Sequence, residues 1–487
     1  MDTNISKLAP QPIWKHFAEI CKIPHPSYHE AEIREYLVKF AKEHNLEHFV
    51  DGGNNVIIRK PATPGMESRK GIVIQAHVDM VPQKNSDKEF DFTKDSIVAY
   101  IDGDWVTADG TTLGADNGIG VAAILAVLES NDIKHGPIEA LFTATEETGM
   151  DGAFGLKAGE LSGDILLNLD SETEGELYVG CAGGQDFNVS MPYHTVAIKK
   201  KDFAGYRIEV KGLKGGHSGI EIILQRANAN KLMARTLIGI QEKMNVLLCS
   251  IDGGGLRNAI PREAFATVAV DKAFEKKFLA AIKRYEKLYN TEYKDIEDKI
   301  EINAVAIPCP ARCIDILDQC YLLDAVQACP NGVIKMSTSM PGLVQTSTNL
   351  ARVVSEKGKF TVFGLMRSSV RSEKEDLALS IRTVFELAGG KVKMGGAYDG
   401  WNPNMQSPIL ATMKESYKSL YGTEPKVVAI HAGLECGIIG GVYPNMDMIS
   451  FGPTICYPHS PAEKVNITSV EKFWKYLCHT LENAPAK

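Results

Sequence analysis

The sequence predicts an α/β protein in which a mainly parallel-sheet domain is interrupted by an inserted α+β domain. In the N-terminal third, short apolar runs alternate with helical patterns, as in parallel sheets with crossover helices. After about residue 184 the pattern changes to alternating, half-exposed strands. The last segment carries His459, a residue of the same metal-binding kind as those near the first strands. This last segment must therefore return to the first domain if His459 is a ligand there.

The elements of the first domain follow from the spacing of apolar residues. Residues 30–43 place apolar side chains at helical spacing and predict an amphipathic helix. Residues 118–128 are apolar on most faces and predict a buried helix entered by the turn at 114–117. Short apolar runs typical of buried strands cover residues 55–59, 72–76, 138–144 and 165–169.

The inserted domain has a different character. Residues 207–211 and 266–270 alternate like half-exposed antiparallel strands, and residues 225–242 and 276–289 predict amphipathic helices. A glycine-rich stretch at 389–400 closes it. We therefore divide the chain into residues 1–186 (first domain, first part), 187–396 (inserted domain) and 397–487 (first domain, second part).

The insert contains a candidate internal repeat. Residues 253–262 (GGGLRNAIPR) and 341–352 (PGLVQTSTNLAR) each place Gly-Leu before a polar stretch, an Asn and an Arg. A duplication would make Asn258 and Asn349 equivalent. The alternative is a coincidence between two glycine-containing hairpins, and both interpretations stay open.

Composition excludes several classes of protein. The 487 residues are 44% hydrophobic and 23% charged, with a net charge of −8, so no basic surface is available to bind nucleic acid. No window approaches a membrane span, and the first residues lack a signal-peptide core. We expect a cytoplasmic protein with reduced thiols. Four of its ten cysteines are close in sequence, but their irregular spacing favours buried thiols over a zinc site: Cys309, Cys313, Cys320 and Cys329.

Five segments each end an apolar run with a residue of the metal-binding kind. Parallel strands bring such residues together at their carboxyl ends. Two His and three carboxylates suit Zn²⁺, and the same ligands accept Co²⁺ or Mn²⁺. The pattern predicts metal-assisted hydrolysis. The candidate ligands are His77, Asp116, Glu147, Asp170 and His459, with Asp79 and Glu146 beside two of them.

Short motifs recur along the chain: HVD at 77–79, GADNG at 114–118, TEETG at 145–149, NLDSE at 168–172, GGHSG at 215–219, RNAIPR at 257–262, HAGLECG at 431–437 and HSP at 459–461. Taken in this order, they resemble the M20 family of metallopeptidases, and within it the aminoacyl-histidine dipeptidases. The likeness covers nearly the whole chain and implies a zinc-exopeptidase-like fold with a lid.

The resemblance implies two metal ions bridged by Asp116. His77 and Asp170 would complete one ion, and Glu147 and His459 the other. By resemblance and by its position beside a ligand, Glu146 is the general base. Asp79 would orient His77.

The resemblance also implies roles for the inserted domain, which would act as a lid. His217 would donate a hydrogen bond to the tetrahedral oxyanion, within its own subunit or across a dimer. Candidate substrate contacts are Asn258 and Arg367 for the α-carboxylate, with Arg262 pairing inside the lid, and Glu435 for the α-ammonium group. His431 is a substrate contact or a core residue. A homodimer is expected from the habit of the family.

The favoured function is hydrolysis of unblocked dipeptides, including Xaa-His substrates of the carnosine type. The alternative is an N-acyl amino acid deacylase or desuccinylase, which would use the same metal ligands and bind a different group of the substrate. A third hypothesis, an inactive ligand-binding relative, is disfavoured because Glu146 and all five candidate ligands are present.

Overall fold

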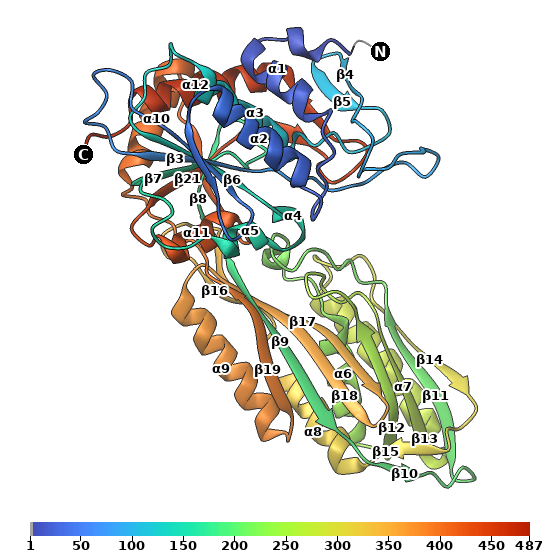
Figure 1. Cartoon of the computed structure of the whole chain (residues 1–487). Coiled ribbons are helices and arrows are strands. Elements are labelled where there is room, and N and C mark those ends of the chain that lie inside the picture. The colour runs from blue at the N-terminus through green and yellow to red at the C-terminus, as the bar shows by residue number, and fades with distance from the viewer. Residues whose placement is uncertain (1–2) are drawn as a thin grey trace. The chain divides into compact units, whose positions relative to one another are not determined.

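The computed structural model describes residues 3–487, and these fold into two compact units (Figure 1). Unit 1 comprises the described residues up to Cys181, together with Trp401–Ala429 and Leu434–Lys487. Unit 2 comprises Ala182–Gly400 and the short segment Ile430–Gly433. The sequence did not anticipate that four residues near the C-terminus belong to unit 2.

Unit 1 is built on an eight-stranded sheet with the order β1-β2-β6-β3-β7-β21-β8-β20. The central strands β6, β3, β7 and β21 are parallel, whereas β1 and β2 on one side and β8 on the other pair antiparallel. The centre of the sheet is parallel, as predicted, and antiparallel strands lie on both sides of it. The bounds are β1 (Glu47–Val50), β2 (Val56–Lys60), β3 (Ile72–His77), β6 (Ile138–Thr143), β7 (Ile165–Asn168), β8 (Glu176–Cys181), β20 (Lys426–Ile430) and β21 (Asp447–Ser450).

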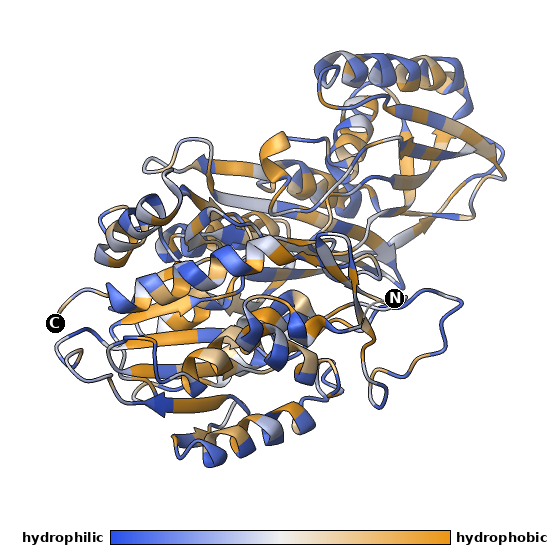
Figure 2. Ribbon diagram, turned by 90° about the horizontal axis from the view of Figure 1, so that it is seen from above, coloured by the Kyte–Doolittle hydropathy of each residue, from blue (hydrophilic) through white to orange (hydrophobic). Residues whose placement is uncertain are grey.

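Burial explains why the central strands read as unbroken apolar runs. Every residue of β3, β6 and β7 is buried, and Figure 2 colours such strands mostly as hydrophobic. A second, four-stranded sheet of unit 1 has the order β22-β23-β5-β4. Its strands are β4 (Ala99–Asp102), β5 (Trp105–Ala108), β22 (Ile455–Cys456) and β23 (Lys464–Asn466).

Helices of unit 1 pack against the eight-stranded sheet and against one another. Helix α3 contacts both α1 and β3, while α10 contacts α12 and β21. Thirteen of the fifteen residues of α3 are buried, as its apolar sequence predicted. The bounds are η1 (Ile5–Lys7), α1 (Gln11–Ile20), α2 (Ala31–Glu43), α3 (Ala115–Glu129), α4 (Glu146–Gly149), α5 (Asp151–Gly155), α10 (Pro408–Tyr421), α11 (Glu435–Val442) and α12 (Ile467–Glu482).

Unit 2 contains a sheet with the order β14-β11-β13-β12-β17-β18-β9-β19, and β16 also pairs with β17. Helix α6 packs on β11, β12 and β13, and α9 packs on β9, β18 and β19. The bounds are β9 (Gly183–Pro192), β10 (Thr195–Ala197), β11 (Phe203–Lys211), η2 (Ile222–Leu224), α6 (Ala229–Gln241), β12 (Val246–Gly254), β13 (Ala264–Asp271), η3 (Lys272–Phe274), α7 (Glu275–Glu292), β14 (Glu301–Ile307), β15 (Arg312–Ile314), α8 (Ile316–Ala328), β16 (Gly332–Met336), β17 (Val344–Glu356), β18 (Lys359–Ser368), α9 (Arg371–Leu387) and β19 (Lys391–Tyr398).

The two halves of this sheet repeat one strand order. From its outer edge inward, the first half runs β14-β11-β13-β12 and the second half runs β19-β9-β18-β17. In chain order within each half, these are the fourth, first, third and second strands. The two halves meet where β12 pairs with β17. This repeat supports an internal duplication, which stays a prediction. The proposed equivalence of Asn258 and Asn349 is wrong, because Asn258 follows β12 in a loop and Asn349 lies inside β17.

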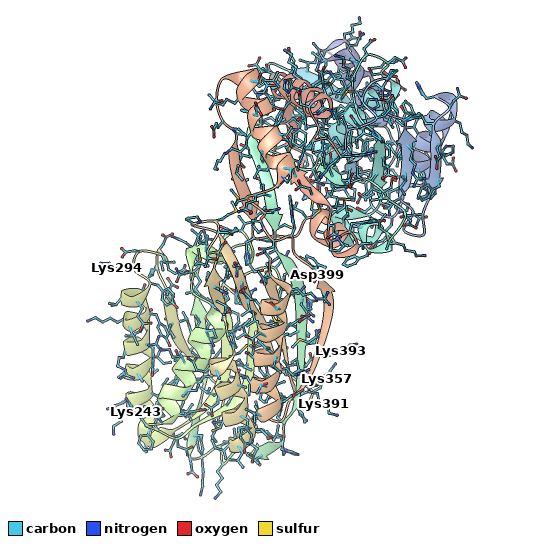
Figure 3. All side chains as sticks on the ribbon, turned by 90° about the vertical axis from the view of Figure 1, so that its left-hand side faces the viewer. Lys243, Lys294, Lys357, Lys391, Lys393 and Asp399 are labelled. Carbon is cyan, nitrogen blue, oxygen red and sulfur yellow. The ribbon has the colours of Figure 1, made fainter. Side chains whose placement is uncertain are left out.

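Strand β19 forms one edge of this sheet and carries charge on its exposed side. Lys391 and Lys393 are exposed at alternate positions along it. Figure 3 labels both of them, and it also labels Lys357, Lys243 and Lys294 of unit 2. Charged side chains on an edge strand discourage pairing with another chain.

The cysteine cluster is only partly buried. Cys313 and Cys329 are buried, whereas Cys309 and Cys320 have intermediate exposure. On helix α8, Leu317 is 62% exposed, whereas Leu323 is 1% exposed. The helix therefore turns the side that carries Leu323 inward. Among the helices of residues 3–487, none is both long and apolar enough to cross a membrane.

Candidate metal centre

The carboxyl ends of three parallel strands deliver four of the predicted site residues to one edge of the sheet in unit 1. His77 is the last residue of β3, Asp170 lies two residues after β7, and Glu146 and Glu147 begin α4 directly after β6. Because β6, β3 and β7 are neighbours and parallel, these side chains converge. This is the edge at which parallel sheets bind ligands.

Two loops complete the cluster. Asp116 is the second residue of α3, where the backbone is not yet helical, and His459 lies between β22 and β23. Ligand atoms of His77, Asp116 and Asp170 all lie within 4.8 Å of one another, as do those of Asp116, Glu147 and His459. Asp116 belongs to both groups and turns one oxygen to each: Oδ1 is 3.1 Å from His77 Nε2, and Oδ2 is 3.2 Å from His459 Nε2.

These groups fit divalent metal ions. The remaining contacts are 3.2 Å between His77 Nε2 and Asp170, and 2.9 Å between His459 Nε2 and Glu147. Ligands about 2.0–2.1 Å from a tetrahedral zinc ion stand about 3.3–3.4 Å apart, so only a small expansion is needed. His77, Glu146 and Glu147 form a third such group.

Charge gives a second test of the fit. In the part of the chain that the structure describes, the carboxylates of Asp116, Asp170 and Glu147 form ion pairs with histidines alone. The buried Glu147 Oε1 has no hydrogen-bond partner there. Buried carboxylates without a cation are costly. The residues present therefore suit two cations that share Asp116.

The close approach of these charged groups shifts the pKa values of the histidines and of Asp170. Burial lowers the pKa of His77, but the charge of Asp170 and hydrogen bonds to three aspartates outweigh burial and hold it well above its usual value. Hydrogen bonds to Asp116 and Glu147 raise the pKa of His459 to about 11. Burial raises the pKa of Asp170 to about 6. The cluster thus attracts positive charge strongly.

Asp79 joins a histidine of this cluster to the turn that begins α4. Its Oδ1 accepts from the backbone N–H of Glu146 at 2.9 Å and lies 3.4 Å from His77 Nδ1. Its Oδ2 accepts from the N–H of Glu147 at 3.2 Å and from Ser27 Oγ at 2.8 Å. His77 Nδ1 also lies 3.0 Å from the backbone oxygen of Asp79. One carboxylate therefore fixes the ring of His77 and the start of α4 together.

The turn that carries Glu146 is held in an uncommon backbone conformation. Thr145 has φ 56°, in the left-handed region that β-branched residues rarely adopt. Its hydroxyl donates to Glu30 Oε1 at 2.7 Å, and Glu30 is 6% exposed. Burial, with the charges of Asp170 and other acids, raises the pKa of Glu146 well above its usual value, although His77 opposes the shift.

Glu435 lies in a buried polar network of unit 1. Its Oε2 accepts from Gln75 Nε2 at 2.6 Å and from Thr143 Oγ1 at 2.7 Å, and its Oε1 is buried without a partner among the described residues. Burial raises the pKa of Glu435 to about 8. Burial and the charges of Asp116 and Asp170 likewise raise the pKa of Glu172 to about 8. Glu172 therefore belongs to the same crowded acidic surroundings as the candidate ligands.

In unit 2, the loop around His217 has a defined hydrogen-bonding state. His217 Nδ1 accepts from the backbone N–H groups of Gly219 at 3.2 Å and Ile220 at 3.1 Å. Burial, with the charge of Arg367, lowers the pKa of His217, so the ring is neutral at neutral pH. A neutral ring that accepts at Nδ1 carries its proton on Nε2. His217 therefore presents an Nε2–H donor.

Arg367 and His431 lie beside this loop. A Cβ on Gly219 would stand 3.0 Å from His217, 3.2 Å from Arg367 Nε and 2.5 Å from the backbone oxygen of His431. Arg367 is 7% exposed, and its Nε lacks a hydrogen-bond partner within residues 3–487. His431 Nε2 lies 2.7 Å from Ser347 Oγ, and burial lowers the pKa of His431 to about 3. Arg367 Nη1 donates to Tyr398 Oη at 3.4 Å, so the unpartnered Nε is the part of this buried guanidinium that is suited to binding an anion.

The other candidates of unit 2 are less buried. Asn258 is exposed, and its backbone oxygen accepts from the N–H of Ser218 at 2.7 Å. Arg262 is also exposed and donates from Nε to the backbone oxygen of Leu213 at 3.3 Å. This bond within unit 2 agrees with the expectation that Arg262 pairs inside the inserted domain.

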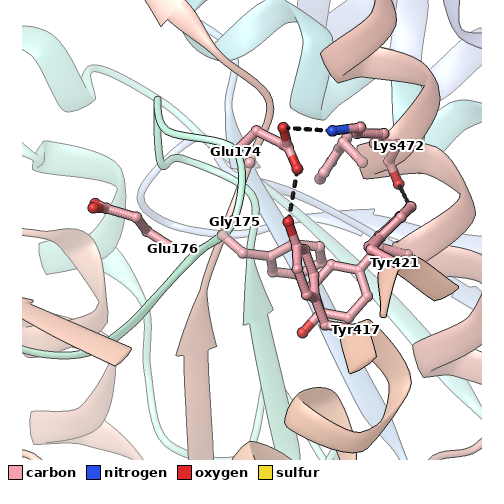
Figure 4. A pocket seen from close by; sticks show the side chains of 10 residues that line it. Glu174, Gly175, Glu176, Tyr417, Tyr421 and Lys472 are labelled. Carbon is pink, nitrogen blue, oxygen red and sulfur yellow. Dashed lines mark hydrogen bonds and ion pairs between the residues drawn. The ribbon is translucent and has the colours of Figure 1, made fainter. Parts of the chain in front are cut away.

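A separate small cavity of unit 1 is unsuited to a substrate. It has a volume of about 10 Å³ and is lined by Glu174, Tyr417, Tyr421 and Lys472 (Figure 4). That is room for about one water molecule. Glu174 accepts from Tyr417 Oη at 2.8 Å and from Lys472 Nζ at 3.1 Å, which gives this acid a structural role.

Comparison with known proteins decides the family. Peptidase family M20/M25/M40 matches residues 73–483. The chain belongs to this family. It therefore hydrolyses peptide bonds, and its fold is the mixed α/β fold of the family. The resemblance stated from the motifs is confirmed.

Two relatives match over their full lengths. The cytosol non-specific dipeptidase of Escherichia coli is 47% identical over 487 residues, which is 100% of both chains. The crystal structure of aminoacylhistidine dipeptidase from Vibrio alginolyticus is 50% identical with a TM-score of 0.95, and the match covers 99% of this chain and 98% of that one. The aminopeptidase PepT of Bacillus cereus, at 16% identity and a TM-score of 0.57 over 98% and 99% of the two chains, shares the fold.

Several residues that support the M20 site were missed by the sequence analysis. Ser27 and Glu30 hold Asp79 and Thr145, and Asn117 Nδ2 donates to Asp170 at 2.5 Å. Glu463 accepts from the loop that carries Asp116. None of them ends an apolar run, and Glu463 is 347 positions from Asp116. The one available signal was the short distance in sequence from Glu463 to His459.

The shared position of Asp116 predicts an unequal loss of metal. We expect chelator-treated wild-type protein to take up two equivalents of Zn²⁺ or Co²⁺. Asp116→Asn should lose most of both equivalents, because this carboxylate contributes to both groups. Glu147→Gln should lose chiefly one. Elemental analysis after gel filtration measures the stoichiometry, and equal losses in the two variants would contradict a shared carboxylate.

Proposed function

We propose that this M20 peptidase is a metal-dependent dipeptidase that cleaves unblocked dipeptides, Xaa-His substrates among them. The observation that carries the proposal is the pair of ligand groups sharing Asp116, with Glu146 beside them. Full-length similarity to two dipeptidases supports the choice of substrate class. We further propose zinc as the metal, and, from the name of the E. coli relative, a cytosolic location.

The proposed chemistry uses five ligands and one base. When bound, the two ions would polarise the scissile carbonyl and lower the pKa of the attacking water. Glu146 takes the proton of that water and later delivers it to the leaving amine. The environment of Glu146, which raises its pKa, supports this role because a base must also act as an acid within one turnover. Asp79 contacts both the ring of His77 and the backbone N–H of Glu146, and so fixes their positions relative to each other.

His217 is the proposed oxyanion donor. Its Nε2–H is free to donate because Nδ1 is occupied by two backbone N–H groups. A preorganised donor aimed at developing negative charge stabilises the transition state more than the ground state. The neutral state of the ring matters less than its orientation, which the glycine-rich loop fixes. The donor acts from its own chain or from a second copy in a homodimer.

Charged groups at both ends of a free dipeptide have proposed partners. Arg367, with its unpaired Nε, binds the α-carboxylate, and Asn258 supplies a further donor. The buried, unpartnered Oε1 of Glu435 accepts from the α-ammonium group. Glu435 is 0% exposed, so this contact is strongly desolvated. An acylated amine would leave that oxygen unpaired, which disfavours N-blocked substrates.

Substitution of the base should separate metal binding from turnover. We expect Glu146→Gln to retain both metal equivalents and lose about 10²–10⁴-fold in kcat, the usual contribution of general acid–base catalysis. Glu482→Gln, which alters an exposed acid paired with Lys134, is the control. Turnover near the wild-type level in a metal-loaded Glu146→Gln protein would remove the assignment.

Substitution of the oxyanion donor should act on kcat. His217→Ala should lower kcat by about 10²–10³-fold with a smaller change in KM. His194→Ala is the matched control, since this histidine of unit 2 is 87% exposed. A change confined to KM would make His217 a ground-state binding residue instead.

Substrate class is tested directly by three compounds. We expect metal-loaded protein to hydrolyse β-Ala-His and Ala-His, to be inhibited by a chelator, and to leave N-acetyl-Ala-His intact. Release of free histidine measures each reaction. Cleavage of the acetylated compound alone would move the chain to the deacylase hypothesis and remove the role proposed for Glu435.

A further inference from the structure

A buried carboxylate, that of Glu463, occupies a cradle of backbone N–H groups beside the candidate metal centre. Its Oε2 accepts from the N–H groups of Leu113 at 2.7 Å and Gly114 at 3.0 Å. Its Oε1 accepts from Ala115 at 2.8 Å and Asp116 at 3.2 Å. The side chain is 2% exposed. Four consecutive N–H groups thus converge on one side chain that the proposed reaction does not use.

The loop at 113–116 depends on this acceptor. Gly114 has φ 72°, and the dihedral angles of Asp116 (φ −83°, ψ 106°) are not helical, although α3 begins here. Successive N–H groups of such an irregular turn form a concavity that binds anions. Leu113 is 1% exposed and Ala115 is 0% exposed. Water cannot replace the carboxylate at these N–H groups without opening the loop.

The other end of Glu463 is fixed by the second sheet of unit 1. Its backbone oxygen accepts from Thr107 Oγ1 of β5 at 2.7 Å, and the next residue, Lys464, pairs with Thr107 in the ladder between β23 and β5. Glu463 also lies four residues after His459. It therefore joins the loop that carries Asp116 to the segment that carries His459.

Asp116 requires accurate placement more than any other member of the cluster. One of its oxygens lies 3.1 Å from His77 Nε2, and the other lies 3.2 Å from His459 Nε2. A shift of its backbone would misplace both oxygens at once. The N–H of Asp116 is itself one of the four donors to Glu463, so the carboxylate of Glu463 acts on the backbone of Asp116 directly.

We propose that Glu463 is a positioning residue that holds Asp116 in place between the two metal groups and thereby sets the affinity for both ions. This inference rests on the metal centre proposed above. Glu463 contacts neither the substrate nor the reacting atoms. It acts as a built-in anion in the cradle, and metal binding depends on the cradle being filled.

The competing explanation is a purely structural role, in which Glu463 only stabilises the fold of unit 1. The two explanations differ in what they predict for those molecules of a variant that remain folded. A structural role lowers the melting temperature and leaves the affinity and the visible spectrum of bound Co²⁺ unchanged. A positioning role changes both at temperatures where the variant is folded.

The experiment titrates chelator-treated protein with Co²⁺ and follows its visible absorption. We expect Glu463→Gln to bind Co²⁺ about 10–100-fold more weakly with an altered spectrum, as is usual when a partner of a metal ligand is removed. Glu463→Asp, which keeps the charge on a shorter side chain, should fall between. Glu174→Gln, another acid of unit 1 held by Tyr417 and Lys472 (Figure 4), should match the wild type.

A small anion supplies a second readout. Glu463→Ala leaves the cradle empty, so formate should restore its Co²⁺ affinity toward the wild-type value. Formate should not restore Glu463→Gln, whose amide fills the same space. The wild type should not respond to formate.

The outcomes separate the two levels of the proposal. Wild-type protein that takes up no Co²⁺ would contradict the metal centre itself. Wild-type protein that binds two equivalents, with folded variants of Glu463 that bind them equally well, would overturn only the role of Glu463. A weakened Glu463→Ala protein that formate fails to restore, beside an unaffected Glu463→Gln, would also overturn it.

Discussion

Repulsion among buried carboxylates is the constraint on which this site depends. Asp116, Asp170 and Glu147 converge at one edge of a parallel sheet with only two histidines to balance them. In a medium of low dielectric constant such a cluster is stable only if cations enter it or protons neutralise it. Other residues of unit 1 must therefore hold these carboxylates together until cations or protons balance their negative charge.

Backbone N–H groups provide much of that support. Asp79 accepts from the N–H groups of Glu146 and Glu147, and Glu463 accepts from four N–H groups before α3. These two acids add negative charge to the region, yet each is satisfied by fixed donors. Among the candidate ligand carboxylates, Glu147 instead keeps one oxygen, Oε1, buried without a partner among the described residues. The two supporting acids and Glu147 thus differ in how fully they are hydrogen-bonded.

The sequence predicted the parts of this arrangement that depend on local pattern. His77 and Asp170 follow apolar runs, and parallel strands bring such positions together, so both could be placed from the sequence alone. The antiparallel strands β2 and β8 could not be distinguished from parallel ones, because both kinds of strand have similar apolar runs when buried. Helix α8 shows the same limit, since spacing alone did not decide that Leu317 faces solvent.

Supporting residues could not be predicted because their partners lie far away in the chain. Nothing about Glu463 as a residue type distinguishes it from a surface acid until the loop at 113–116 is placed beside it. Asn117 is similar, because its contact with Asp170 appears only in three dimensions. The equivalence of Asn258 and Asn349 failed for the converse reason, since two similar sequences occupy a loop and a strand.

The unpaired polar atoms of the two units have opposite requirements, and this bears on the substrate. In unit 1, the free oxygens of Glu147 and Glu435 require positive charge or a donor. In unit 2, Arg367 Nε and the Nε2–H of His217 require an acceptor. A free dipeptide offers an ammonium group and a carboxylate, and its hydrolysis creates a transient oxyanion. A substrate blocked at its amine meets only the second requirement. The proposed preference for unblocked dipeptides is therefore supported by the atoms that lack a partner in each unit.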